Sequence, residues 1–345
     1  MGEILRVGDR QIGLGHPTFF IAEEGQANQG NLDVALQMIR VAAWAKADAI
    51  EFQLAIADDF YVRTHPGHAI YKAREFSKEQ LERLFSTAQE ACIVAFAAPL
   101  SSRLVPVLAG LGCPLFNINS SDVNNPDMLD AVAATRCPFF LSTAMAMLEE
   151  IDWAVAHVQS RGCDNFALLH GQHSMLSADG SGVPEYETNL ASIEFLRHRY
   201  GVPVGFIDHT SNPIMPVVAA LRGAAVVSKH FALSRALQGP DWHICLEPRE
   251  LADTVKQLRM AENTIGKPDK VLARGEMQDR AQMRRSIVTA RALLSGAKLR
   301  PEDLRFKRPG TGLSPRQVTE ILGRVLAVDL AEDDQVLLEH LRKEG

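Results

Sequence analysis

The chain alternates between short apolar runs and longer segments in which apolar residues recur every three to four positions. Fully apolar runs of four to eight residues are typical of parallel strands that are buried on both faces. Eight such runs cover residues 18–23, 49–54, 93–99, 115–120, 139–144, 166–171, 204–210 and 225–231. The pattern therefore predicts eight buried strands.

The segments between these runs have the 3.6-residue period of amphipathic helices. They include residues 32–46, 78–91, 102–111, 147–160, 188–199 and 249–265. Ser77, followed three residues later by Gln80, has the pattern of a capping box and favours a helix that starts at residue 78. Eight strands alternating with helices predict a (β/α)8 TIM barrel. A doubly wound sheet is the weaker alternative, because no G-x-G-x-x-G turn follows the first strand.

The two ends of the chain differ from this alternation. Residues 1–17 predict a hairpin, because two short apolar stretches flank Gly8, Asp9 and Arg10. The barrel domain is expected to cover residues 1–266, and the charged residues 267–283 are expected to form a linker. Short strand-like runs and one helical segment in residues 284–345 predict a separate α+β domain. A domain of this size buries a modest core, so we expect it to pack against another surface.

Composition excludes several classes of protein. The net charge of −6 argues against broad binding to nucleic acid or to anionic membranes. No stretch has the apolar length of a transmembrane helix, and the N-terminus lacks the apolar core of a signal peptide. The five cysteines are scattered without a C-x-x-C pair, which is typical of buried, reduced thiols. The sequence therefore predicts a cytoplasmic protein.

Two histidines end neighbouring strands of the expected barrel. His209 lies near the end of the seventh run and His230 near the end of the eighth. A single histidine at a strand end is more often structural, but catalytic groups of TIM barrels gather at the carboxyl ends of the strands. With Glu23 and Asp241 available nearby, the pair predicts a metal site. Imidazole and carboxylate ligands suit Mn²⁺ or Zn²⁺, which would act as a Lewis acid or orient a water.

Two further features have competing interpretations. His170 and His173 follow the sixth strand and either join the metal site or serve a structural role. Arg308 begins the stretch RPGTGL, whose proline and glycines fix tight turns. Arg308 is then either a solvated turn residue or an arginine held on a firm loop to reach a ligand, including one in a neighbouring subunit.

Several stretches resemble one family in the right order along essentially the whole chain. They are FIAEEGQANQGNLDVAL from Phe20, LSTAMAMLEEI from Leu141, VGFIDHTSN from Val204, VVSKHFALSRALQGPDWHICLEP from Val226, and RRSIV followed by FKRPGTGL in the small domain. These stretches resemble the motifs of the sialic acid synthase family, which includes N-acetylneuraminate synthase and spore coat polysaccharide biosynthesis protein E. RRSIV and FKRPGTGL resemble its C-terminal SAF, or antifreeze-like, domain.

The resemblance implies a barrel enzyme that condenses phosphoenolpyruvate with an N-acyl amino sugar and releases phosphate, in nonulosonic acid or surface polysaccharide biosynthesis. It implies a divalent metal on His209 and His230, typically Mn²⁺, with Zn²⁺, Mg²⁺ or Co²⁺ as alternatives. It also implies a homodimer with swapped SAF domains, in which Arg308 enters the partner's active site. The remaining residues that we expect to act are Glu23, Asp241 and Asp122 in catalysis, and Gln53, Ser120, Ser142 and His173 in substrate binding.

The chain departs from the family motifs where the resemblance places phosphoenolpyruvate. Glu51 stands where the family has a lysine, Asn117 stands where it has a second lysine, and Ala98 stands where it has a threonine. The loop of residues 171–186 also differs and is the expected place of changed specificity. Two hypotheses remain open. Either the chain performs the condensation through altered contacts, or it is a metal- and sugar-binding protein, or a metal-dependent enzyme that acts on another carbonyl compound.

Overall fold

The computed structural model describes residues 4–173 and 182–343. Contacts divide the chain into two compact units, Met1–Gly266 and Lys267–Gly345. Each unit is described by itself below. In both, the strand and helix positions follow from where the chain buries its apolar residues.

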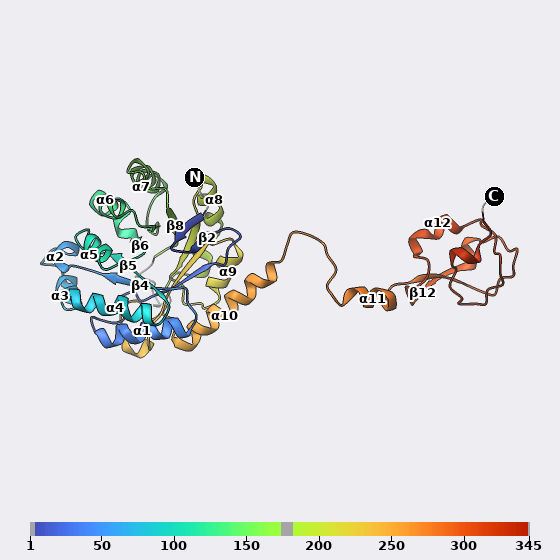
Figure 1. Cartoon of the computed structure of the whole chain (residues 1–345), viewed down its shortest axis with the longest axis horizontal. Coiled ribbons are helices and arrows are strands. Elements are labelled where there is room, and N and C mark those ends of the chain that lie inside the picture. The colour runs from blue at the N-terminus through green and yellow to red at the C-terminus, as the bar shows by residue number, and fades with distance from the viewer. Residues whose placement is uncertain (1–3, 174–181, 344–345) are drawn as a thin grey trace. The chain divides into compact units, whose positions relative to one another are not determined.

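The first unit is built on a closed barrel of parallel strands (Figure 1). Its strands in the described chain are β3 (Phe19–Glu23), β4 (Ala49–Leu54), β5 (Val94–Pro99), β6 (Phe116–Ile118), β7 (Phe139–Ser142), β8 (Phe166–His170), β9 (Val204–Asp208) and β10 (Val226–His230). They pair in chain order, and β10 closes the ring on β3. The predicted TIM barrel is therefore confirmed.

Helices surround the strands on the outside of the ring (Figure 1). They are α1 (Leu32–Trp44), α2 (Ala57–Phe60), α3 (Pro66–Lys72), α4 (Lys78–Glu90), α5 (Leu104–Gly110), α6 (Pro126–Thr135), α7 (Leu148–Ser160), α8 (Ala191–Tyr200), α9 (Met215–Leu221) and α10 (Pro248–Ile265). The capping box predicted at the start of α4 is confirmed, with Ser77 Oγ accepting from Gln80 N and Gln80 Oε1 accepting from Ser77 N. Among the helices of the described chain, none is long and apolar enough to cross a membrane.

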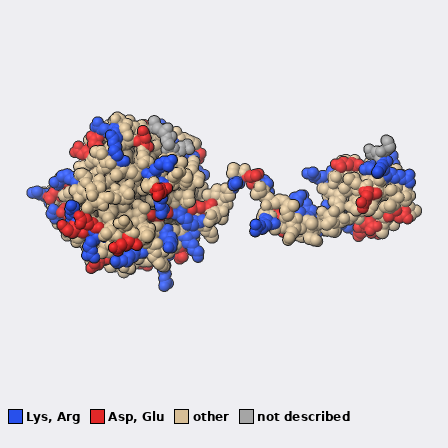
Figure 2. All heavy atoms as spheres, viewed as in Figure 1, with Lys and Arg blue, Asp and Glu red and all other residues tan. Residues whose placement is uncertain are grey.

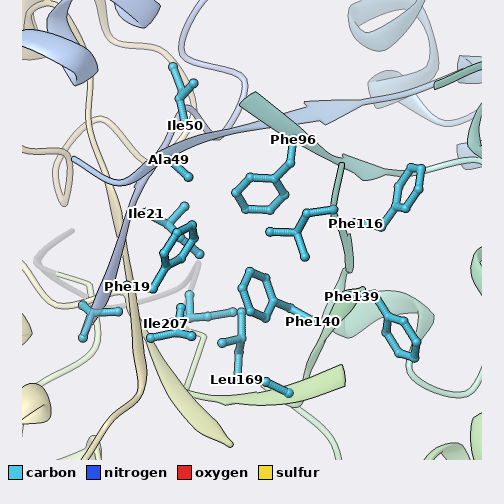
Figure 3. Packing of buried hydrophobic residues seen from close by; sticks show 14 of the residues in the cluster. Phe19, Ile21, Ala49, Ile50, Phe96, Phe116, Phe139, Phe140, Leu169 and Ile207 are labelled. Carbon is cyan, nitrogen blue, oxygen red and sulfur yellow. The ribbon is translucent and has the colours of Figure 1, made fainter. Parts of the chain in front are cut away.

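The barrel is filled by side chains that alternate along each strand (Figure 3). Phe96 and Phe140 project into the ring and meet edge to face, with centroids 5.9 Å apart. Phe139 faces the helices instead and stacks on Phe166 at 5.4 Å. Since successive strand residues point to opposite faces, the polar residues near the strand ends are sorted in the same way. This sorting decides which of them can reach a ligand in the mouth of the barrel.

The predicted N-terminal hairpin is confirmed as an antiparallel pair, β1 (Ile4–Val7) and β2 (Arg10–Gly13). Arg10 Nη1 bonds to Asp48 Oδ1 at 2.5 Å, and Asp48 Oδ2 accepts from the backbone N of Phe20 at 2.8 Å. These contacts tie the hairpin to the first barrel strand. On the face shown in Figure 2, basic and acidic side chains of this unit are interspersed.

The second unit contains the antiparallel strands β11 (Ser286–Thr289) and β12 (Leu304–Lys307) and the short helix α12 (Val318–Ile321). Its small core is formed by Ile287, Leu293, Leu299, Leu304, Ile321, Leu326, Leu330, Val336 and Leu341. Within the expected linker, residues Glu276–Met283 form helix α11, which the sequence did not predict. No residue of α11 is buried, so this helix lacks the apolar periodicity that would have predicted it.

Candidate active site

The carboxyl ends of the barrel strands carry a cluster of buried polar side chains. Glu23 and Glu51 lie on the neighbouring strands β3 and β4 in direct register. Asn117 comes from β6, and Ser228 and His230 come from β10. All five residues are at most 5% exposed. We call this group, together with Gln53, Ser142 and His209, the mouth cluster.

Two hydrogen-bonded groups organise the mouth cluster. Gln53 Nε2 donates to Glu23 Oε1 at 3.1 Å, and Ser228 Oγ donates to Glu23 Oε2 at 2.9 Å. Asn117 Nδ2 donates to Glu51 Oε1 at 3.0 Å, and the second oxygen of Glu51 has no partner among residues 4–173 and 182–343. Glu23 therefore has both oxygens fixed by donors, whereas Glu51 has one oxygen free.

The two histidines predicted as metal ligands lie side by side. Their ring centroids are 5.2 Å apart, and His230 Nε2 is 3.6 Å from Glu23 Oε1. Among the described residues, neither ring nitrogen of His230 has a hydrogen-bond partner, and neither does Nδ1 of His209. Burial, followed by the nearby charges of His230, His173 and Lys229, lowers the pKa of His209 well below its usual value. The neutral imidazole is the form that binds metal ions.

The two imidazoles are suitable ligands for a divalent ion. Within residues 4–173 and 182–343, no three His, Cys, Asp or Glu side chains are grouped to hold a metal ion. The structure thus does not bring Glu23 or Asp241 to the histidines as a third ligand. An ion held there would keep its other positions for solvent or substrate.

Close packing fixes the position of the His230 ring. Gly25 lies against it with a φ of 53°, and a Cβ atom at this position would come within 2.4 Å of His230 Nδ1. Any other residue would therefore be both strained and in collision with the ring. Our sequence reasoning did not single out Gly25, because nothing in the sequence says which side chain lies against a glycine.

A buried ion pair behind the histidines joins the ends of β9 and β10. Lys229 Nζ is 3.0 Å from Asp208 Oδ2, and both side chains are fully buried. Lys229 Nζ also donates to the carbonyl of Thr210, whose N–H donates to Asp208 Oδ1 at 2.8 Å. Asp208 and Lys229 directly precede His209 and His230, so the pair anchors the backbone that carries both rings.

Of the other predicted residues, some contact the mouth cluster and some do not. His173 lies edge-on to His209, with centroids 4.7 Å apart, and Ser142 Oγ donates to Asn117 Oδ1 at 2.9 Å. His170 is structural, since its ring bonds to the carbonyl of Thr188 at 3.0 Å. The rest of the loop of residues 171–186 lies partly outside the described residues, which exclude 174–181.

Ser120 and Asp122 lie in a 3₁₀ turn, Ser120–Asp122, beyond the end of β6. Asp122 accepts hydrogen bonds from Asn125 at 2.7 Å and from Ser121 at 3.0 Å. It lines a polar cavity of about 530 Å³ together with Arg103. This places Asp122 in contacts of its own, separate from the two hydrogen-bonded groups of the mouth cluster.

Asp241 lies half-buried in the loop after β10, with a φ of 54°. Its charge acts on Tyr71, whose pKa burial raises to about 12. Tyr71 packs against Phe60 and Tyr61, with centroids 5.1 and 5.4 Å away. Our sequence reasoning missed this aromatic group, whose residues lie in or directly after the short helices α2 and α3, which are too short to give a periodic signal.

Arg308 lies exposed in the second unit, in the stretch that follows β12. Ser286 Oγ donates to the carbonyl of Pro309 at 2.6 Å and accepts from Gly312 N at 2.8 Å. Ser286 is fully buried, so the loop beside Arg308 is attached to the core of its unit.

Comparison with known proteins decides the family. The model of the NeuB family matches residues 38–270, and the SAF domain model matches residues 284–342. The chain belongs to the NeuB family. As a NeuB family member, it joins a group of sialic acid synthase-like proteins of nonulosonic acid biosynthesis, and its C-terminal unit is a SAF domain.

Three relatives show how far the similarity extends. An uncharacterised protein of Methanocaldococcus jannaschii is 33% identical over 98% of this chain and 99% of its own length. An N,N'-diacetyllegionaminic acid synthase of Legionella pneumophila is 30% identical, with 94% of each chain covered. The crystal structure of an N-acetylneuraminic acid synthetase from Leptospira borgpetersenii, in complex with citrate, is 31% identical with a TM-score of 0.74 over 81% of this chain and 95% of that one. Similarity to this NeuB family structure confirms the barrel fold.

Proposed function

We propose that the protein condenses phosphoenolpyruvate with the aldehyde of an N-acyl amino sugar, or with a related aldehyde, and releases phosphate. The methylene carbon of phosphoenolpyruvate bonds to the aldehyde carbon, whose oxygen takes a proton. Water adds to the former enol carbon as phosphate leaves it, and the product is a 2-oxo acid. The observation that carries the proposal is the buried pair His209 and His230 beside Glu23, with three ring nitrogens that have no partner among the described residues.

A divalent ion is the cofactor of this proposal, with Mn²⁺ first and Zn²⁺, Mg²⁺ or Co²⁺ as alternatives. His209 and His230 would hold it, and when bound it supplies Lewis acid activation of the aldehyde oxygen. Glu23 is kept in one orientation by Gln53 and Ser228, which suits a carboxylate that positions a water or a substrate hydroxyl. His173 lies edge-on to His209, and in this proposal it contributes to substrate binding.

The proposal includes a homodimer in which Arg308 of one subunit contacts the N-acyl group of the sugar in the other. The support is the attachment of the loop beside Arg308 to Ser286. A loop fixed in this way loses less conformational entropy when its arginine binds a ligand than a free loop would.

A second candidate function follows from the charges around Glu51. The charged side chains that act on Glu51 are the carboxylates of Glu23 and Glu24, and Lys229 is taken by Asp208. Such surroundings favour a ligand with fewer negative charges than phosphoenolpyruvate. The chain would then be a metal-dependent enzyme acting on another carbonyl compound, or a metal- and sugar-binding protein.

Calorimetry of phosphoenolpyruvate with the Mn²⁺-loaded protein separates the two candidates. Binding heat that disappears in the His209→Ala and His230→Ala variants is expected for the condensing enzyme. Absence of any binding by the loaded wild-type protein would rule out the condensation and leave the second candidate.

A further inference from the structure

Glu51 lies on β4 in register with Glu23 at the end of β3, and among the described residues it receives a hydrogen bond at one of its two oxygens. Ser142 Oγ donates to Asn117 Oδ1 at 2.9 Å, and Asn117 Nδ2 donates to Glu51 Oε1 at 3.0 Å. Because Asn117 Oδ1 accepts from Ser142, the amide group of Asn117 directs its Nδ2 donor at Glu51, and Oε1 of Glu51 is the acceptor. Since the Glu51 side chain is only 1% exposed, bulk water does not solvate its other oxygen.

Glu51 and Glu23 have unequal surroundings. Glu23 accepts hydrogen bonds at both oxygens and lies 3.6 Å from His230. Glu51 has one donor, and the charged groups that act on it are Glu23 and Glu24. Burial first, and then the charge of Glu23, raise the pKa of Glu51 well above its usual value. A buried carboxyl group with one donor and two neighbouring carboxylates favours its protonated form.

The position of the proton follows from the hydrogen bonds. Oε1 already accepts from Asn117, so a proton on Glu51 belongs on Oε2, which has no partner in the described part of the chain. A buried O–H group without an acceptor is costly unless a ligand supplies one. Of the two oxygens, Oε2 is thus the one that still needs an acceptor.

We propose that Glu51 is a neutral carboxylic acid whose Oε2–H group donates a hydrogen bond to an oxygen of the ligand bound in the barrel mouth. The inference rests on the proposed function for the identity of that ligand, phosphoenolpyruvate. A short O–H···O⁻ bond to an anionic oxygen is among the stronger hydrogen bonds in proteins. Glu51 then contributes a donor to an anionic ligand where an ionised glutamate would repel it.

Infrared difference spectroscopy of the full-length protein tests the protonation state directly. The wild-type minus Glu51→Gln spectrum is expected to show the C=O stretch of a protonated carboxyl group. Recording it on the alkaline side of the Glu24 transition, at about 7, removes the contribution of that residue, and the Glu24→Gln variant serves as the matched control. The proposal is overturned if the difference spectrum shows only carboxylate bands.

The same band tests the contact with the ligand. Phosphoenolpyruvate, or N-acetylmannosamine as a second probe, is expected to shift the Glu51 band to lower frequency. If phosphoenolpyruvate does not bind, the proposed function fails, and the response to N-acetylmannosamine still decides the role of Glu51. A band that neither probe shifts overturns the contact.

Affinity measurements with two variants give an independent test. Glu51→Gln keeps a neutral donor and is expected to bind phosphoenolpyruvate within about threefold of the wild-type protein. Glu51→Ala removes the donor and is expected to bind about 10- to 100-fold more weakly, the usual effect of losing a hydrogen bond to a charged group. Tighter binding by Glu51→Ala would show an ionised, repelling Glu51 and overturn the proposal. Thermal unfolding of each variant checks that it is folded.

Discussion

Removal of Lys229 by the Lys229→Met substitution is expected to destabilise the barrel strongly. Lys229 Nζ lies 3.0 Å from Asp208 Oδ2, and both side chains are fully buried. At an effective dielectric constant of about 20, two charges at this distance attract by roughly 5–6 kcal/mol. Desolvation of both ions offsets much of this attraction in the intact pair, but the variant leaves Asp208 buried without its counter-ion. We expect the unfolding free energy to fall by about 3–5 kcal/mol.

Urea denaturation followed by tryptophan fluorescence measures this loss in the barrel. The three tryptophans, Trp44, Trp153 and Trp242, all lie in the first unit, so the signal reports its unfolding. The double variant Asp208→Asn with Lys229→Met should recover most of the loss, because no unpaired charge remains.

The matched control is Lys78→Met, which removes an exposed lysine 3.9 Å from Glu82. Exposed pairs of this kind contribute less than about 1 kcal/mol, so the control should change stability little. The reasoning is refuted if Lys229→Met costs no more than the control, or if the double variant is as unstable as the single one.

Three further predictions concern the site. His209→Ala and His230→Ala should each lower the content of bound Mn²⁺ measured by elemental analysis, whereas His170→Ala should not; full occupancy in both variants would contradict the site. Burial raises the pKa of Glu24 from 4.5 to about 7. Between these values the folded state binds more protons than the unfolded chain. The unfolding free energy should therefore fall as pH rises from about 4.5 to 7. Titration of stability should show a flatter slope in Glu24→Gln, and an unchanged slope would refute this assignment. Light scattering should report a dimer, and Arg308→Ala should raise KM for the sugar; a monomer in solution would contradict the shared site.

The sequence predicted the parts of the fold that apolar burial determines. All eight expected strands form, because each buries apolar residues on both faces and is bounded by polar turns. The ends are less well predicted, since β6 stops at Ile118 and Ser120 belongs to the following 3₁₀ turn. Helix α11 was not predicted because it buries no residue, so it carries no apolar period.

The candidate site was predicted as far as strand order determines it. His209 and His230 lie side by side because neighbouring parallel strands end at the same edge of the barrel. The pairing of Lys229 with Asp208 could not be predicted. The direction in which each side chain points depends on the alternation of residues along its strand, which is hard to assign near the end of a barrel strand. The state of Glu51 depends on burial and on Glu23 across the strand register, which no local pattern expresses.

The proposed neutral state of Glu51 bears on whether the site can bind an anionic ligand. On charge alone, a glutamate in place of a lysine removes an attraction and adds a repulsion, which argues against an anionic ligand. Burial beside Glu23 favours the neutral acid, so the repulsion is absent and a donor is gained. A neutral Glu51 is therefore compatible with the proposed condensation.

The most direct test of the proposed function is the release of inorganic phosphate from phosphoenolpyruvate by the Mn²⁺-loaded protein in the presence of N-acetylmannosamine. The account predicts release that requires the sugar, forms one 2-oxo acid per phosphate, and stops when the metal is chelated or when His209 or His230 is replaced by alanine. Phosphate release that is unaffected by chelation and by both substitutions, or no release with any N-acyl amino sugar, would contradict it.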